Sequence, residues 1–298
     1  MESGIANLLH MLQDRVKKLC ESGRWEEAGQ AAAASIEKAR SNLSHHDPSS
    51  LQNLITSIEI QGDVQRQYGD LEAARLSYLE ALELLNDRPG NEEQLARISA
   101  SVAVVYDSAG SVDEAITFYE HSITLFEQLN PPALLDVAEL CNNVGYLYKS
   151  KNDFDKAEAR YLNALQICYE NLGMEDLETA SVCSNLGALY LLTQHPLQAL
   201  EMHKMALEIR LTKLDEDHLD VAQSYSNLGL VFAESGNLEA SKEHFEKSWG
   251  IYDDKAEEEP LDYAAVSENY ATILRQTGNE RKALSIDKRS LKVLKKVS

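Results

Sequence analysis

The segment Asn143-Val144-Gly145-Tyr146-Leu147-Tyr148 returns twice further along the chain. Its second copy is Asn185-Leu186-Gly187-Ala188-Leu189-Tyr190, and its third is Asn227-Leu228-Gly229-Leu230-Val231-Phe232. Each copy begins 42 residues after the one before it. A fixed period in this range is typical of stacked helical hairpins, because each unit can bury its apolar face only against its neighbours.

Small and aromatic residues follow each copy at constant spacings. Twelve residues after the glycine stands Ala157, Ala199 or Ser241, and four residues later Tyr161, His203 or Phe245. Small residues let two helices cross closely, and we expect the aromatic side chains to fill the gap beside the crossing. The pattern resembles the tetratricopeptide repeat (TPR). This resemblance implies an all-α fold, a right-handed superhelix (α-solenoid) of helical hairpins.

The same frame extends to both ends of the chain, with atypical outer repeats as solenoid ends require. It predicts seven hairpins, at about 9–40, 51–86, 92–130, 134–172, 177–214, 219–254 and 261–297. A length of 298 residues would ordinarily suggest about two domains. Because each hairpin contacts mainly its neighbours, we instead predict one solenoid over residues 1–298.

The charge is large and unevenly distributed. The net charge of −21 argues against nucleic acid as a partner, because phosphate binding needs a basic face. Residues 275–298 nevertheless hold eight Lys or Arg against Glu280 and Asp287. No run of about 18 apolar residues is present, and the N-terminus does not read as a signal peptide. We therefore predict a cytoplasmic location.

No motif in the sequence points to catalysis or to a bound cofactor. His45-His46-Asp47 has no third ligand at a fixed spacing, so we predict no metal site. No Ser or Cys lies in a nucleophile motif, and no glycine-rich loop follows a strand. Cys141 and Cys183 share one repeat position and are predicted to be reduced core thiols. The sequence therefore predicts a protein that is not an enzyme and has no small-molecule substrate.

Two segments carry a closer family resemblance. Leu172-Gly173-x-x-Asp176-Leu177-x-Thr179-Ala180 and Asp217-His218-x-Asp220-Val221-Ala222 resemble the 42-residue repeats of kinesin light chains. The resemblance covers about residues 95–290. Eukaryotic kinesin light chains also carry a heptad coiled coil, which this sequence lacks. The chain is thus more similar to the bacterial members of the family, which accompany bacterial tubulins.

That resemblance implies an adaptor that binds a tubulin-like filament. A general peptide-binding TPR adaptor and the sensor domain of a regulatory system are the alternatives. In TPR arrays the first helix of each hairpin lines a concave groove. The predicted groove residues are Asn143, Tyr146, Lys149, Asn185, Ala188, Leu191, Leu192, Asn227, Leu230, Asn269 and Arg275.

The asparagines of this groove have two readings. An amide donates and accepts at once, so a row of amides can bind the backbone of a peptide segment. Alternatively, the amides satisfy neighbouring groups of the protein itself. The centre of the groove is neutral, with Arg97, Lys149 and Arg275 as its candidate basic contacts. We therefore expect an apolar or amphipathic segment as the ligand.

The C-terminal helix, about 281–297, is predicted to be basic on its surface. The cations are Lys282, Lys288, Arg289, Lys292, Lys295 and Lys296. Most of its apolar residues are expected to pack on the preceding helix: Ala283, Leu284, Ile286, Leu291, Val293, Leu294 and Val297. The cations have two readings, a polar cap of the solenoid or a contact with an anionic surface, either a membrane or an acidic filament face.

Overall fold

The computed structural model describes residues 2–44, 47–86 and 90–297, with only the backbone described for 2–6, 48 and 297. Residues His45, His46 and Pro89 lie outside this description. Within it the secondary structure is helical throughout and contains no strand, so the predicted all-α fold is confirmed. No described helix is both long and apolar enough to cross a lipid bilayer.

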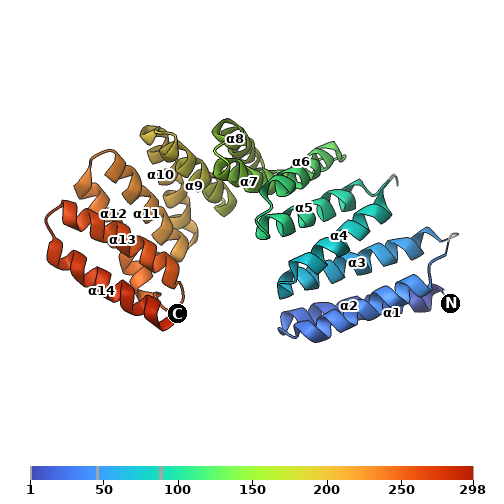
Figure 1. Cartoon of the computed structure of the whole chain (residues 1–298). Helices are drawn as coiled ribbons and strands as arrows, with labels where there is room; N and C mark the ends of the chain where they lie inside the picture. Colours follow the sequence, from blue (N-terminus) through green and yellow to red (C-terminus); the bar gives the residue numbers. More distant parts are fainter. Residues whose placement is uncertain (1, 45–46, 87–89, 298) are drawn as a thin grey trace. The chain divides into compact units, whose positions relative to one another are not determined.

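The described chain forms fourteen helices, joined by short connections (Figure 1). They are α1 (Glu2–Glu21), α2 (Trp25–Ser41), α3 (Pro48–Tyr68), α4 (Leu71–Leu85), α5 (Glu92–Ser108), α6 (Val112–Gln128), α7 (Leu134–Ser150), α8 (Phe154–Asn171), α9 (Leu177–Leu192), α10 (Pro196–Lys213), α11 (Leu219–Glu234), α12 (Leu238–Asp254), α13 (Pro260–Gln276) and α14 (Glu280–Val297). Consecutive helices pair into seven hairpins.

The hairpins fall into two compact units, residues 1–140 and 141–298, with the boundary inside α7. In the first unit α2 packs on α3, and α4 packs on α5. In the second unit α8 packs on α9, α10 on α11, and α12 on α13. Within each unit, then, the second helix of one hairpin holds the first helix of the next. One continuous solenoid over 1–298 remains a prediction.

Glycine meets an aromatic ring where the two helices of a hairpin cross. A Cβ atom added to Gly187 would lie 2.7 Å from the His203 ring, and one added to Gly145 would lie 2.8 Å from the Tyr161 ring. The crossings of this kind are Gly62–Tyr78, Gly145–Tyr161, Gly187–His203 and Gly229–Phe245. The rings thus lie directly against the glycines, and not beside the crossing as the sequence suggested. At these four crossings a side chain would force the ring or the helix to move.

The turn inside each hairpin needs one residue in the left-handed region. Gly236 takes this position in the sixth hairpin with φ of 75°. Its equivalents are Asn152 (φ 60°) in the fourth hairpin and Gln194 (φ 63°) in the fifth. A side chain on a left-handed residue costs roughly 1–2 kcal/mol, less for Asn than for Gln. The turn geometry is therefore imposed by the packing of the helices, even where the residue does not favour it.

Candidate partner-binding surfaces

The first helices of the second unit lie side by side. Helix α9 contacts α11, and the Asn185 side chain donates a hydrogen bond to the Asn142 Oδ1 atom of α7 over 2.9 Å. These helices present one surface built from α7 (from residue 141), α9 and α11. We call it the first-helix face.

The asparagine row is half-buried on this face. Asn143, Asn185, Asn227 and Asn269 all have intermediate exposure. The Asn185 amide is bound to Asn142 of the neighbouring hairpin. For this amide, therefore, the structure supports the reading in which it satisfies another group of the protein.

Apolar side chains are unevenly exposed on the face. Tyr146 is 53% exposed and Leu192 is 55% exposed, while Ala188 and Leu191 are half-buried. Leu230 packs against the core cluster that contains Phe245 and is not a free contact. The accessible apolar area is therefore concentrated on α7 and α9.

Of the three candidate basic contacts, two are already neutralised. Arg97, in the first unit, donates to both Glu59 oxygens over 2.9 and 3.2 Å. Arg275 forms ion pairs with Glu280 and Asp287.

Lys149 differs from the other two cations. Its Nζ atom lies 4.8 Å from the Tyr146 ring centroid, and among the described residues it has no ion pair with a carboxylate. Burial lowers the pKa of Lys149, because the charged form loses hydration there. Lys149 is thus a half-buried cation beside an exposed aromatic ring, and it is the only Lys or Arg of the first-helix face.

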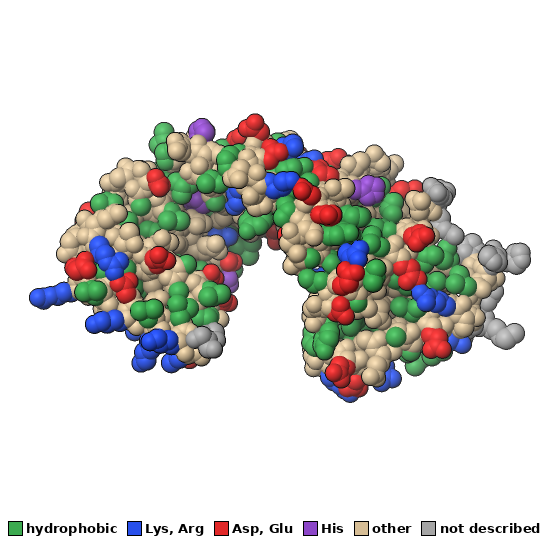
Figure 2. Space-filling view, in the orientation of Figure 1, with side chains coloured by type: hydrophobic (Ala, Val, Ile, Leu, Met, Phe, Trp, Pro, Cys, Tyr) green, Lys and Arg blue, Asp and Glu red, His purple; other side chains and the backbone are tan. Residues whose placement is uncertain are grey.

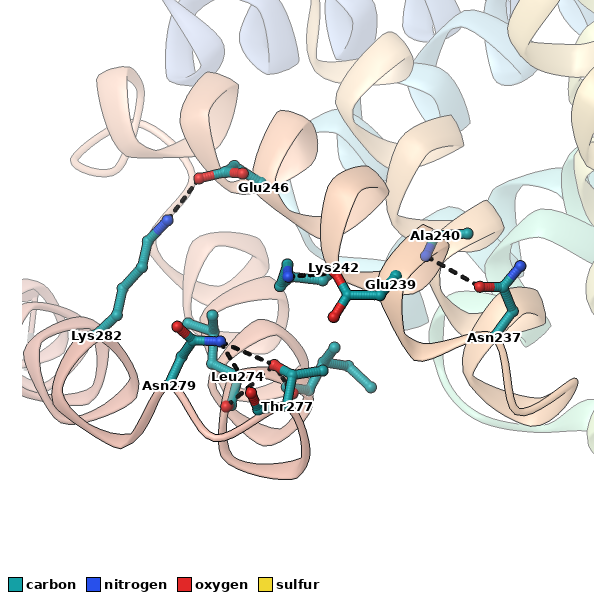
Figure 3. Close-up of polar contacts among 10 residues, drawn as sticks. Asn237, Glu239, Ala240, Lys242, Glu246, Leu274, Thr277, Asn279 and Lys282 are labelled. Carbon is teal, nitrogen blue, oxygen red and sulfur yellow. Dashed lines mark hydrogen bonds and ion pairs between the residues drawn. The ribbon is translucent and has the colours of Figure 1, made fainter.

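The cations of α14 divide into two groups. Lys282 pairs with Glu246 over 2.5 Å, Arg289 pairs with Asp253 over 2.6 Å, and Lys296 pairs with Glu257. Figure 3 shows the Lys282–Glu246 pair joining α14 to α12. Among the described residues Lys288, Lys292 and Lys295 are exposed and form no ion pair. Figure 2 shows Lys and Arg side chains gathered over α14, at the lower left. Three of the six cations of the predicted basic surface thus attach α14 to carboxylates of α12 and of the connection that follows it.

The apolar residues of α14 also divide. Ala283 and Ile286 are buried, and Val293 and Leu294 are half-buried. Leu284 and Leu291, however, are 47% and 58% exposed. These two leucines are thus exceptions to the expectation that most of the apolar residues pack on the preceding helix. The side chain of Val297 is outside the described residues.

Two buried polar side chains of α10 were not singled out by the sequence. His203 fills the aromatic position of its hairpin and is 1% exposed, and burial lowers its pKa to about 4, helped by the nearby Arg210 charge. Arg210 is 6% exposed. Its Nη1 atom donates to Ser224 Oγ over 2.7 Å and to the Asp220 carbonyl over 3.2 Å. The repeat frame marks both positions as core, so the only available signal was a polar residue in an apolar position.

The described residues contain no cluster of three or more His, Cys, Asp or Glu able to hold a metal ion. None of the four cysteines forms a disulfide bond, and Cys141, Cys168 and Cys183 are buried. Burial raises the pKa of Cys183 to about 11, so this thiol is poorly suited to nucleophilic chemistry.

Comparison with known proteins agrees with the geometry. The family model of the tetratricopeptide repeat matches residues 136–212, 198–254 and 220–296. No curated protein sequence matches the chain.

Several solved structures are similar over most of the chain. The crystal structure of BtubC (BKLC) from P. vanneervenii is 28% identical, with a TM-score of 0.67, over 78% of this chain and 92% of that one. The apo form of RapI is 16% identical, with a TM-score of 0.62, over 82% and 98%. A putative kinesin light chain from Podosopora anserina with nearly identical TPR-like repeats is 16% identical, with a TM-score of 0.60, over 70% and 99%. The last two similarities concern the fold alone.

Proposed function

Because the chain belongs to the tetratricopeptide repeat family, a fold that generally serves as an interaction scaffold, we propose that it is a kinesin-light-chain-like adaptor that binds a tubulin-like filament. The similarity to BtubC (BKLC) supports the choice of this family branch, since it extends over nearly all of that chain. One observation within the molecule carries the proposal. Tyr146, Lys149 and Leu192 form an exposed apolar and cationic strip on the first-helix face.

The strip suits a segment with mixed character. Leu192 offers apolar surface, and full burial of a leucine is worth about 1.5–3 kcal/mol. On the neighbouring helix α7, Lys149 and Tyr146 offer a cation and an aromatic ring 4.8 Å apart. An amphipathic segment with one carboxylate matches these groups, because the carboxylate pairs with Lys149 while apolar side chains cover Leu192.

Co-sedimentation with assembled bacterial tubulin tests this proposal. We expect the unaltered chain to pellet with the filaments and Leu192→Glu to weaken binding about tenfold or more, since a charge then replaces an apolar contact. The matched control is Leu197→Glu on α10, because Leu197 is 80% exposed and lies on a second helix. Equal loss in both variants, or no pelleting of the unaltered chain, would favour the general adaptor or sensor reading.

An anionic membrane is a second candidate partner, through α14. The exposed Lys288, Lys292 and Lys295 favour it, at about 1 kcal/mol for each cation near an anionic membrane. Lys282, Arg289 and Lys296, the other three cations of the predicted basic surface, already bind carboxylates. The sequence analysis had assigned all six of these cations to the basic surface. Flotation with anionic and neutral vesicles tests the contact, and equal binding to both would remove it.

A further inference from the structure

One side of α14 combines exposed apolar and basic residues. Leu284, Lys288, Leu291 and Lys295 follow one another at spacings of four, three and four residues, which places them on one helix face. Both leucines are about half exposed. We call these four residues the outer face of α14. It belongs to the last helix of the second unit, and no described residue covers it.

The 42-residue frame shows what this face corresponds to in the preceding hairpin. Lys288, Leu291 and Lys295 occupy the positions of Glu246, Trp249 and Asp253 in α12. In both helices one apolar residue lies between two charged residues. The charged residues are acidic in α12 and basic in α14.

In α12 the apolar position anchors the hairpin that follows. The Trp249 ring lies 6.2 Å from the rings of both Tyr263 and Tyr270 on α13. Its indole nitrogen donates to Ser267 Oγ over 3.1 Å. Trp249 thus fixes the first helix of the next hairpin by apolar contact and by a hydrogen bond.

The two acidic residues at these positions of α12 bind α14, the second helix of the hairpin that α13 begins. Glu246 pairs with Lys282 over 2.5 Å (Figure 3), and Asp253 pairs with Arg289 over 2.6 Å. The two carboxylates are seven residues apart on α12, and the two cations are seven residues apart on α14. Equal spacing on two packed helices lets both pairs form together.

The apolar anchor recurs in the earlier hairpins. The position of Leu291 is filled by Ile123, Leu165 and Leu207 in α6, α8 and α10. Of these, Ile123 is buried and Leu165 packs in the core clusters of its unit. The outer face of α14 therefore retains the apolar residue by which an inner hairpin holds its successor.

We propose that the outer face of α14 binds a helical hairpin of a partner protein, which continues the stack. The first helix of that hairpin packs on Leu291, as α13 packs on Trp249. Its second helix places two carboxylates, seven residues apart, opposite Lys288 and Lys295. The reversed charges set this requirement, because a hairpin with cations at those positions, like that of α13 and α14, is repelled.

This occupant fits the face better than a lipid surface or a second copy. A lipid surface would also accept Leu284 and Leu291 beside the lysines, but it requires no seven-residue spacing of Lys288 and Lys295. In the first hairpin of a second copy, counted from the left-handed turn glycine, the positions of Lys282 and Arg289 are filled by Glu27 and Ala34. A second copy would therefore place one carboxylate, and not two, opposite the lysines. The proposal concerns α14 and is independent of the first-helix face.

A graft provides the test. The full chain is extended after residue 297 by a copy of residues 256–297, which keeps the 42-residue period. One version of the copy is unchanged, and the other carries Lys282→Glu and Arg289→Glu. We expect hydrogen exchange to show the Glu copy protected about tenfold or more over the unchanged copy, because two charge pairs replace two repulsions.

Substitutions in the host helix complete the design. Leu291→Ser should remove most protection of the Glu copy, although the exposed position leaves the host intact. Lys288→Glu together with Lys295→Glu should reverse the preference, so that the unchanged copy becomes the protected one. Lys204→Glu on α10 is the matched charge control. It should change the protection of neither the unchanged copy nor the Glu copy. Equal protection of both copies, or indifference to Leu291→Ser, would overturn the proposal.

Two measurements on the unextended chain address the other occupants. Light scattering after size exclusion should show one mass for the unaltered chain and for Leu291→Ser. A larger mass that Leu291→Ser abolishes would assign the face to a second copy and overturn the proposal. Binding to anionic vesicles that requires Leu291 as well as Lys288 and Lys295 would assign it to a membrane, with the same consequence.

Discussion

Substitution of Gly187 by alanine tests the contact on which every hairpin of this kind depends. The new Cβ atom would lie 2.7 Å from Cε1 and 2.8 Å from both ring nitrogens of His203. Carbon atoms in good contact are about 3.5–4.0 Å apart, so the ring or the helix must move by most of an ångström. His203 is 1% exposed, so its ring cannot move into solvent without a shift of its neighbours. Overpacking of this kind costs about 1–3 kcal/mol.

The same substitution also has a favourable effect, which a matched control removes. Alanine is about 1 kcal/mol better than glycine inside a helix. Gly250 lies within α12, and a Cβ atom added there meets no atom within 4 Å. Gly250→Ala should therefore stabilise the second unit by about 1 kcal/mol. The difference in free energy of unfolding between the two variants isolates the clash and should be about 1–3 kcal/mol.

Urea unfolding followed by circular dichroism measures this difference. Both glycines are in the second unit, so both variants report on the same set of hairpins. A double variant, Gly187→Ala with His203→Ala, should recover the clash energy, because the small side chain leaves room for the new methyl group. If Gly187→Ala stabilised the protein as much as Gly250→Ala does, the ring would not press on the glycine and the assigned crossing would be wrong.

Three further predictions concern single residues of the second unit. The folded pKa of His203, about 4, lies below its unfolded value of about 6.5. Between about pH 4 and pH 6.5 the His203 side chain is therefore protonated in the unfolded state but not in the folded state. Stability should be complete above about pH 6.5 and fall by roughly 3 kcal/mol towards pH 4. His203→Phe should abolish this fall in pH-dependent urea titrations, and an unchanged pH profile would contradict the burial. Gln194→Gly should raise the free energy of unfolding by about 1 kcal/mol by relieving a left-handed glutamine. Asn152→Gly should raise the free energy of unfolding by less. A lower free energy of unfolding for Gln194→Gly would contradict the strain assigned to the left-handed glutamine. Arg210→Met should stay within about 1 kcal/mol of the parent, because Ser224 still donates to the Asp220 carbonyl over 3.0 Å. Arg210→Ala should cost roughly 2 kcal/mol or more in the same assay by opening a cavity.

The hairpins could be predicted from the sequence because their signals are periodic. One glycine at a crossing is weak evidence, but Gly145, Gly187 and Gly229 recur at a constant 42 residues with a ring 16 residues after each. The turn positions follow the same period, since Gln194 lies in the position that Gly236 fills in the next hairpin. The direct contact between glycine and ring could not be predicted, because spacing gives the order of residues along two helices and not their rotation.

The state of each surface cation could not be predicted for a related reason. Arg97 and Glu59 are 38 residues apart, and Lys282 and Glu246 are 36 residues apart. Long flexible side chains reach several neighbours, and the stacking of the hairpins decides which carboxylate is near. The sequence therefore suggested three basic groove contacts where Lys149 alone has no carboxylate partner among the described residues.

Helix α14 shows why a count of charges misleads. Its lysines and arginines form one dense run in the sequence, yet they divide between two sides of the helix. Lys282, Arg289 and Lys296 recur every seven residues and bind carboxylates of the preceding hairpin and loop. Lys288 and Lys295 also recur at seven residues but lie beside exposed leucines. Exposed ion pairs contribute at most about 1 kcal/mol each. The paired set therefore mainly fixes which way α14 is turned, and that rotation decides which cations are left for a partner.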